Sequence, residues 1–160
     1  MEVTYSDLKN KRVFISGGGS GIGATIVEYF CEQKSEVYFI DIDLKSSNKL
    51  IKKIKKNGFR VPKFIECNIL DVKKLQNIIK DIISKKGAIH CLINSAANDD
   101  RHTTEQVDEK YWENRMGINL KHYFFAAQAV VKGMKKIKSG SIVNLSSVSW
   151  MLGEGDKVVY

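Results

Sequence analysis

A run of glycines near the amino terminus has the composition of a phosphate-binding turn. It reads Ser16-Gly17-Gly18-Gly19-Ser20-Gly21-Ile22-Gly23, directly after an apolar, β-branched segment and directly before an amphipathic one. Glycine lets the chain turn sharply and lets backbone N–H groups approach an anion, and a helix start adds partial positive charge. The position between a strand and a helix makes a diphosphate site a better interpretation than an ordinary loop. The residues expected to contact a dinucleotide here are Gly17, Gly19, Ser20, Gly21, Ile22 and Gly23.

An acidic residue follows the glycine run at the sequence spacing expected of a residue that binds the ribose of a dinucleotide. Asp41 ends the second predicted strand, eighteen residues after Gly23. A carboxylate at this point can accept hydrogen bonds from the hydroxyls of an adenosine ribose, and it would repel a 2′-phosphate. A solvated aspartate at a strand end is the alternative, and nearby Asp43 is an example. The turn and the acid together predict binding of NAD in preference to NADP.

The elements that must position these residues alternate along the chain. Short apolar runs at 13–16, 36–40, 62–67, 90–93 and 141–145 predict buried strands, and segments with helical spacing lie between them, the longest from about 108 to 134. This alternation predicts an α/β fold, a doubly wound parallel sheet with helices on both faces and strand order 3-2-1-4-5. Pro62, at the start of the third strand, suits an edge position.

Length and composition limit the class of protein. The 160 residues are 43% hydrophobic, without repeats or linkers, so we expect residues 1–160 to form a single domain. Cys31, Cys67 and Cys91 form no metal-binding or redox motif, which favours reduced, buried thiols and predicts no metal site. The sequence shows neither a membrane-spanning run nor a secretory signal, so a cytoplasmic location and no membrane partner are expected.

The net charge of +8 raises the possibility of a nucleic-acid partner. Eight basic residues and no acidic ones lie between positions 44 and 63, which matches the whole excess. Leu50, Ile51 and Ile54 have helical spacing there and leave the lysines on the solvent side, without interleaved aromatic side chains to stack on bases. A solvated helix face is the better interpretation, and no nucleic-acid partner is predicted.

The glycine spacing and five further motifs resemble the classical short-chain dehydrogenase/reductase family. Gly17, Gly21 and Gly23 give the pattern Gly-x-x-x-Gly-x-Gly. Matches then follow in order along nearly the whole chain. Cys67-Asn68-Ile69 is similar to the family's Asp-Val pair at the adenine, and Asn94-Ser95-Ala96-Ala97 is similar to its Asn-Asn-Ala-Gly. Asn119 matches the catalytic asparagine, Ser147 at the end of the stretch 140–147 matches the catalytic serine, and Tyr160, thirteen residues after Ser147, matches the catalytic tyrosine.

The resemblance implies a mechanism. Tyr160 would be the general base for a substrate hydroxyl, Ser147 would bind the same oxygen, and hydride would pass to the nicotinamide. A phenol is a poor base at neutral pH; the family assists it with a lysine four residues later, at position 164, and Asn119 would hold a water that links that lysine to solvent. Asn68, Ile69, Asn94 and Ala96 would line the cofactor.

This chain ends at Tyr160. We therefore expect the carboxy-terminal strands of the family fold to be missing, residues 1–160 alone to bind NAD weakly and not to turn over, and the full-length protein to be a homo-oligomer.

The substrate implied by the resemblance is a sugar. The stretches 96–102, 111–112 and 119–129, with Ser149-Trp150, are similar to the branch that oxidises aldoses such as xylose or arabinose. Asn98, Ser147 and Trp150 are the expected substrate contacts. Two alternatives stay open: a short-chain dehydrogenase for another alcohol or ketone (acyl, steroid or polyol), and a non-catalytic dinucleotide-binding fragment.

Overall fold

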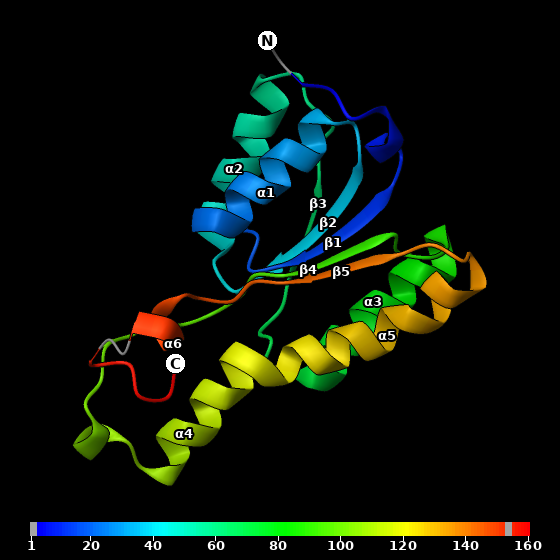
Figure 1. Cartoon of the computed structure of the whole chain (residues 1–160). Helices are drawn as coiled ribbons and strands as arrows, with labels where there is room; N and C mark the ends of the chain where they lie inside the picture. Colours follow the sequence, from blue (N-terminus) through cyan, green and yellow to red (C-terminus); the bar gives the residue numbers. More distant parts are fainter. Residues whose placement is uncertain (1–2, 153–154) are drawn as a thin grey trace.

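A five-stranded parallel sheet forms the centre of the structure, which is a computed structural model that describes residues 3–152 and 155–160 (Figure 1). Its spatial order is β3-β2-β1-β4-β5, which confirms the predicted order 3-2-1-4-5. Val13 pairs with Val37 on one side and with Cys91 on the other. The third and fifth strands are edges, and Pro62 lies just before the third, as expected. The strands are β1 (Arg12–Ser16), β2 (Glu36–Asp41), β3 (Lys63–Glu66), β4 (Cys91–Asn94) and β5 (Ser141–Asn144).

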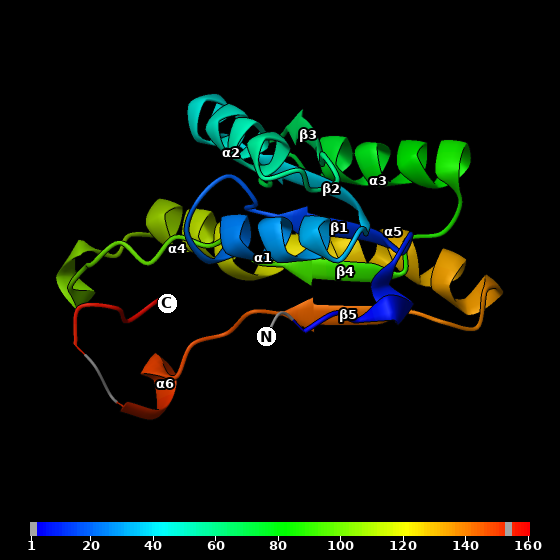
Figure 2. The same cartoon turned by 90° about the horizontal axis from the view of Figure 1, so that it is seen from above.

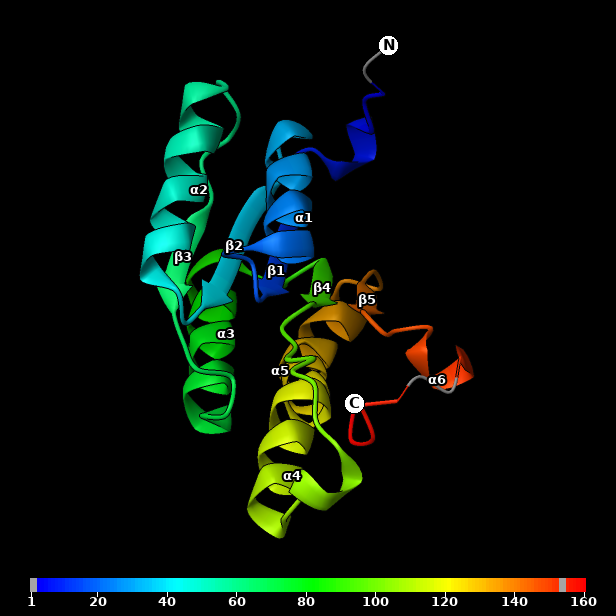
Figure 3. The ribbon, with the colours of Figure 1, turned by 90° about the vertical axis from the view of Figure 1, so that its left-hand side faces the viewer.

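Helices cover both faces of the sheet, as Figure 3 shows from the side. One face carries α1 (Gly21–Glu32) and α2 (Leu44–Lys56), and the other carries α3 (Val72–Lys86) and α5 (His122–Lys136). This arrangement is the predicted doubly wound Rossmann fold. Shorter elements are η1 (Ser6–Leu8), η2 (Thr104–Gln106), α4 (Glu109–Met116) and α6 (Ser149–Leu152).

The helix predicted over 108–134 contains a π-helical segment that the pattern does not indicate. Its first turn is capped by Asp108, whose side chain accepts a hydrogen bond from the Tyr111 N–H at 2.7 Å. Between α4 and α5, η3 (Gly117–Lys121) is wound as a π-helix. Single π turns inside helices often occur at functional sites, and this one carries Asn119.

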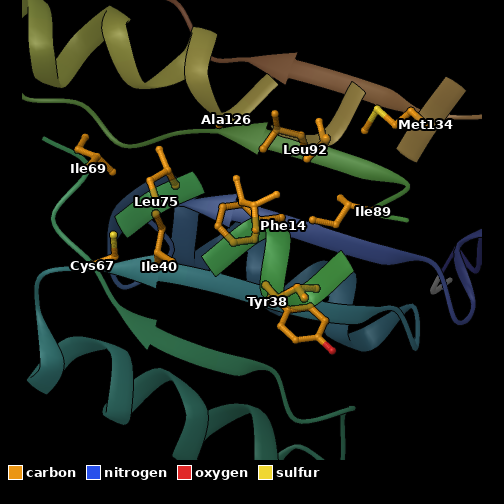
Figure 4. Close-up of a cluster of buried hydrophobic side chains, with 13 residues drawn as sticks. Phe14, Tyr38, Ile40, Cys67, Ile69, Leu75, Ile89, Leu92, Ala126 and Met134 are labelled. Carbon is orange, nitrogen blue, oxygen red and sulfur yellow. The ribbon is translucent and has the colours of Figure 1, made fainter. Parts of the chain in front are cut away.

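Alternation along the buried strands divides the apolar core into two parts. Phe14 and Ile40 pack toward α3 and α5, in the cluster shown in Figure 4. Their neighbours Ile15 and Phe39 pack toward α1 and α2. Each fully buried side chain of this size contributes about 1.5–3 kcal/mol. The two half-cores hold the sheet between its helices, and the carboxyl ends of the parallel strands lie at one edge of the sheet (Figure 2).

The basic second helix is amphipathic as predicted. Leu50 and Ile54 are buried against the sheet, and the lysines of α2 are exposed. Asp43 caps its start by accepting a hydrogen bond from the Ser46 N–H at 2.9 Å. A cap of this kind is worth about 0.5–2 kcal/mol. Asp43 therefore has a structural role at the start of α2, although both it and Asp41 line the cleft described below.

The three cysteines are free thiols. Cys31 and Cys67 are buried and Cys91 is half-buried. Burial raises the pKa of the Cys31 thiol to about 12, so this group is an inert part of the core at neutral pH. Among the residues that the structure describes, no helix has the length and apolar character needed to cross a bilayer.

Candidate functional site

A cleft of about 640 Å³ runs along the carboxyl ends of the strands. In doubly wound sheets this edge is where ligands bind, beside the point at which the strand order reverses. The order reverses here between β1 and β4. The predicted site residues that line the cleft are Gly17, Ser20, Gly21, Ile22, Gly23, Asp41, Asn68, Ile69, Ala96, Asn98 and Tyr160.

The glycine turn is packed so closely that an added Cβ would clash at four positions, Gly17, Gly18, Gly19 and Gly23. Gly17 has a φ of +70°, and a Cβ there would lie 2.6 Å from the Ala96 Cα. A Cβ on Gly23 would collide with the Gly17 carbonyl oxygen. The N–H of Gly17 donates to the Ile40 carbonyl at 2.9 Å, which ties the turn to β2. The backbone can therefore approach a diphosphate without side chains in between.

The start of α1 differs from those of α2 and α3. Asp43 and Asp71 cap those two helices through hydrogen bonds to N–H groups of the first turn. At α1, Ser20 makes no side-chain capping bond to any described residue, and Ser20, Gly21 and Ile22 are exposed at the cleft. Free N–H groups at a helix start bind anions, so this end of the cleft fits the diphosphate of a dinucleotide.

Asp41 links the end of β2 to the glycine turn. Its Oδ2 accepts a hydrogen bond from the Gly19 N–H at 2.8 Å, and its Oδ1 accepts one from the Asp43 N–H at 2.9 Å. Gly19 is buried and is not among the described residues that line the cleft, so its expected contact with the cofactor stays a prediction. Each carboxylate oxygen has a second lone pair, so the half-buried Asp41 can also accept from a ribose hydroxyl.

Asn68 and Ile69 follow β3 and line the cleft beside Asp41. The Asn68 Oδ1 accepts a hydrogen bond from the Leu70 N–H at 3.0 Å. The Ile69 side chain is buried in the cluster of Figure 4. Asn68 therefore presents its exposed amide at the cleft, and Ile69 contributes an apolar wall.

Asn94 lies away from the cleft, in contrast to Ala96 nearby. It is buried at the end of β4, and its Nδ2 donates to the Asn144 Oδ1 on β5 at 2.8 Å. The two asparagines face each other in the strand register. In the described part of the chain, Asn94 thus joins two strands and does not line the cofactor cleft.

Ser16 holds the backbone that follows β4. Its Oγ accepts hydrogen bonds from the N–H groups of Ser95, at 3.2 Å, and Ala96, at 3.3 Å. The same oxygen lies 3.3 Å from Nε2 of His122, which is fully buried at the start of α5. Burial lowers the pKa of His122 to about 4, so the imidazole is neutral at pH 7 and its Nε2 can accept a hydrogen bond from the Ser16 hydroxyl.

Asn119 anchors the loop at the middle of the cleft. Its Oδ1 accepts a hydrogen bond from the Asn98 N–H at 2.8 Å, and its Nδ2 donates to the Asn98 carbonyl at 3.0 Å. Asn98 lines the cleft, and Asn119 is not among the described residues that line it. The two residues predicted for catalysis and substrate binding are therefore in direct contact.

The structure brings Tyr160 to the cleft, but not the whole predicted catalytic set. Tyr160 lines the cleft and is 42% exposed. The Ser147 Oγ donates to the Ser149 Oγ at 2.9 Å, and Ser147 is not among the described residues that line the cleft; its neighbour Ser146 is. The side chain of Trp150 lies outside the described residues.

Tyr123 is a cleft residue to which the sequence analysis assigns no role. Its hydroxyl donates to the Leu145 carbonyl at 2.9 Å. Burial raises the pKa of this phenol, and the nearby Tyr160 raises it further. Its place four residues after Asn119 was the available signal, because residues at that spacing share a helix face.

Comparison with known proteins decides the family. A family model described as short chain dehydrogenase matches residues 11–160. The chain belongs to this family. The resemblance seen in the motifs is thereby confirmed, and a site at the carboxyl edge of the sheet is the expected place for the nicotinamide dinucleotide that short-chain dehydrogenases bind.

The short-chain dehydrogenases most similar in sequence include enzymes named for sugars. The chain is 39% identical to D-xylose 1-dehydrogenase of Caulobacter vibrioides over 98% of its length, and 38% identical to "Probable galactose dehydrogenase GalD" of Rhizobium meliloti over 92%. It spans only 61% and 58% of those two proteins. A gluconate 5-dehydrogenase from Burkholderia cenocepacia J2315, solved with NADP and tartrate, superimposes with a TM-score of 0.83 at 25% identity, covering 95% of this chain and 59% of that one.

Proposed function

We propose that the whole protein is an NAD-dependent oxidoreductase that removes hydride from the hydroxyl-bearing carbon of an aldose, and that residues 1–160 form its cofactor-binding Rossmann domain. One observation carries the proposal. The glycine turn, Asp41 and Tyr160 all line one cleft. A dinucleotide held by the turn and Asp41 would therefore lie in the same cleft as the phenol.

The choice of NAD rests on Asp41. Its carboxylate is held at the cleft by two backbone N–H groups, with lone pairs left for a ribose hydroxyl. A 2′-phosphate there would meet a negative charge within a few ångströms, at a cost of about 1–4 kcal/mol depending on the local dielectric. NAD would supply the hydride acceptor, and the chain would supply its binding and orientation.

The catalytic roles follow the residues at the Tyr160 end. Tyr160 takes the hydroxyl proton of the substrate, and Ser147 hydrogen-bonds the same oxygen after its side chain leaves Ser149. Asn119 fixes Asn98 beside that oxygen. Polar Asn98 and Asp99 in the cleft wall suit a ring that carries several hydroxyl groups.

The chain alone is proposed to bind NAD weakly and to be inactive. Ile142 and Val143 of β5 are 40% and 44% exposed. An edge strand with exposed apolar side chains and unpaired backbone groups is prone to association. Further chain over this strand would also close the cleft around Tyr160.

The whole protein is proposed to be a cytoplasmic homo-oligomer. Leu120 and Phe124, one helical turn apart, are 55% and 65% exposed, and Val131 extends this apolar stripe along α5. Copies of the chain would bury it against each other. Light scattering on the whole protein tests this, and a monomer at micromolar concentration would refute it.

The proposed activity is tested with a substrate panel. NAD reduction would be followed by absorbance with pentoses and hexoses, and with acyl, steroid and polyol alcohols. We expect turnover with one or more aldoses and with NAD at least about tenfold better than with NADP. Turnover only with the other alcohols, or only with NADP, would contradict the proposal.

A further inference from the structure

His102 joins two segments of the chain that are far apart in sequence. Its imidazole is only 4% exposed. Its Nε2 accepts a hydrogen bond from the Val159 N–H at 3.1 Å, across 57 positions, and its own backbone N–H donates to the Asp156 carbonyl at 2.8 Å. In Figures 1 and 3 the end of the chain accordingly lies beside the loop that precedes α4.

The hydrogen bonds of the ring fix its tautomer. The Nδ1 of His102 lies 2.9 Å from the Asp100 carbonyl oxygen. A carbonyl only accepts, so Nδ1 carries the hydrogen, and Nε2 is left as an acceptor for the Val159 N–H. The neutral ring is thus matched to both partners, whereas an apolar ring of the same size would satisfy neither.

The loop that presents His102 is itself held firmly. Arg115 is buried, and its Nη2 lies 3.0 Å from the Asp100 Oδ2. The Tyr111 ring contacts both sides of this arrangement, with the guanidinium 4.7 Å from its centroid and the His102 ring 4.9 Å away. The Asn98 Oδ1 also accepts from the Asp100 N–H at 2.8 Å. These contacts fix the loop that carries His102.

Tyr160 directly follows Val159, whose N–H donates to the His102 ring. The Tyr160 N–H donates to the Lys157 carbonyl at 2.9 Å, inside the same turn. His102 joins that turn to the loop after β4 through the bonds to Val159 and Asp156. A shift of about 1 Å at a reacting group can cost 10²-fold in rate, so the place of the phenol depends on this tether.

We propose that His102 is a positioning residue, which sets where the Tyr160 phenol lies in the cleft by holding the Val159 N–H. The inference rests on the proposed role of Tyr160 as the base. It adds that the loop after β4, besides lining the cleft, carries the support for the catalytic tyrosine.

Three substitutions separate positioning from general structure. His102→Gln can place an amide oxygen near Nε2 and keep the bond to Val159. His102→Asn is also polar but too short to reach it, and His102→Phe keeps the packing on Tyr111 without either nitrogen.

Amide hydrogen exchange in this chain gives the first readout. We expect the Val159 amide to exchange at least about tenfold faster in the Phe and Asn variants and within about threefold of wild type in the Gln variant. An unchanged Val159 rate in His102→Phe would overturn the proposal, whatever the enzyme does.

Kinetics of the whole protein give the second readout. We expect kcat to fall about 10- to 100-fold in the Phe and Asn variants, with the KM for NAD within about twofold, and Gln to restore most of kcat. Equal losses in kcat and in NAD affinity would instead indicate general loss of structure and overturn the proposal.

The two proposals can fail separately. A folded whole protein that oxidises no alcohol would refute the proposed function. In that case the exchange rates, with the Tyr160 ring shifts measured by NMR in the three variants, still decide whether His102 positions the phenol.

Discussion

The side chain of Asn119 satisfies both backbone polar groups of Asn98. Its Oδ1 accepts from the Asn98 N–H at 2.8 Å, and its Nδ2 donates to the Asn98 carbonyl at 3.0 Å. One amide thereby closes a small ring between a π-helical turn and the loop after β4. These two hydrogen bonds therefore fix the backbone of the loop at Asn98, which lines the cleft.

Replacement of Asn119 by Ala is expected to release that loop. Both backbone groups of Asn98 lose their partner, which costs about 1–3 kcal/mol for a half-buried pair. Exchange of the Asn98 amide should accelerate, and urea unfolding should show a lower free energy. Asn119→Asp keeps the acceptor but loses the donor, so it should fall between Ala and wild type. Unchanged exchange at Asn98 in the Ala variant would contradict this account.

Two glycines of the turn provide a matched pair. A methyl group on Gly23 would collide with the Gly17 carbonyl, whereas one on Gly21 meets no atom within 4 Å. Gly23→Ala should therefore abolish NAD binding measured by calorimetry and lower Tm by several degrees. Gly21→Ala suffers only from its φ of +52°, at about 1–2 kcal/mol. Similar losses of NAD affinity in both variants would show that packing of the turn is not the cause.

The free energy of unfolding should decrease as the pH is lowered, because His122 is buried in its neutral form. Burial lowers its pKa to about 4 in the folded chain, against 6.5 as the ordinary value. The unfolded chain thus binds the extra proton first, so stability is full above pH 6.5 and is lost as pH falls toward 4, by up to about 3 kcal/mol. His122→Phe should be less stable at pH 7 but flatter between pH 7 and 4.5 in urea titrations. An unaltered slope would assign the acid sensitivity to other groups.

The fold could be predicted because strands and helices leave strong local patterns. The five apolar runs are strands within one residue of their predicted ends. The central strands β1, β2 and β4 are buried, as continuous apolar sequence predicts. Burial was wrongly predicted for β3 and β5, because both are edge strands whose residues are exposed or half-buried. The π-helical turn at Gly117–Lys121 was not predictable in the same way. It shifts the helical phase by one residue over five positions, which a periodicity window averages out.

The site residues could be predicted where backbone geometry sets their position. They were harder to predict where a side chain has several possible hydrogen-bond partners. The glycine turn and Asp41 follow from chain geometry at a strand end. Asn94 pairs with Asn144 only because the two strands place them opposite each other, and that register is not visible in one sequence. Ser147 likewise turns to Ser149 through a local hydroxyl contact that spacing does not specify.

The most direct test of the account measures cofactor choice when Asp41 loses its charge. Asp41→Asn keeps the volume and an acceptor for the Gly19 N–H or the Asp43 N–H, and Asp43→Asn is a matched control, since asparagine also caps helices well. Calorimetry of the whole protein should show NAD binding at least about tenfold tighter than NADP in wild type and in the control, and a ratio near one in Asp41→Asn. A wild-type protein that binds neither dinucleotide, or an unchanged ratio in Asp41→Asn, would contradict the central claim that the glycine turn and Asp41 bind NAD.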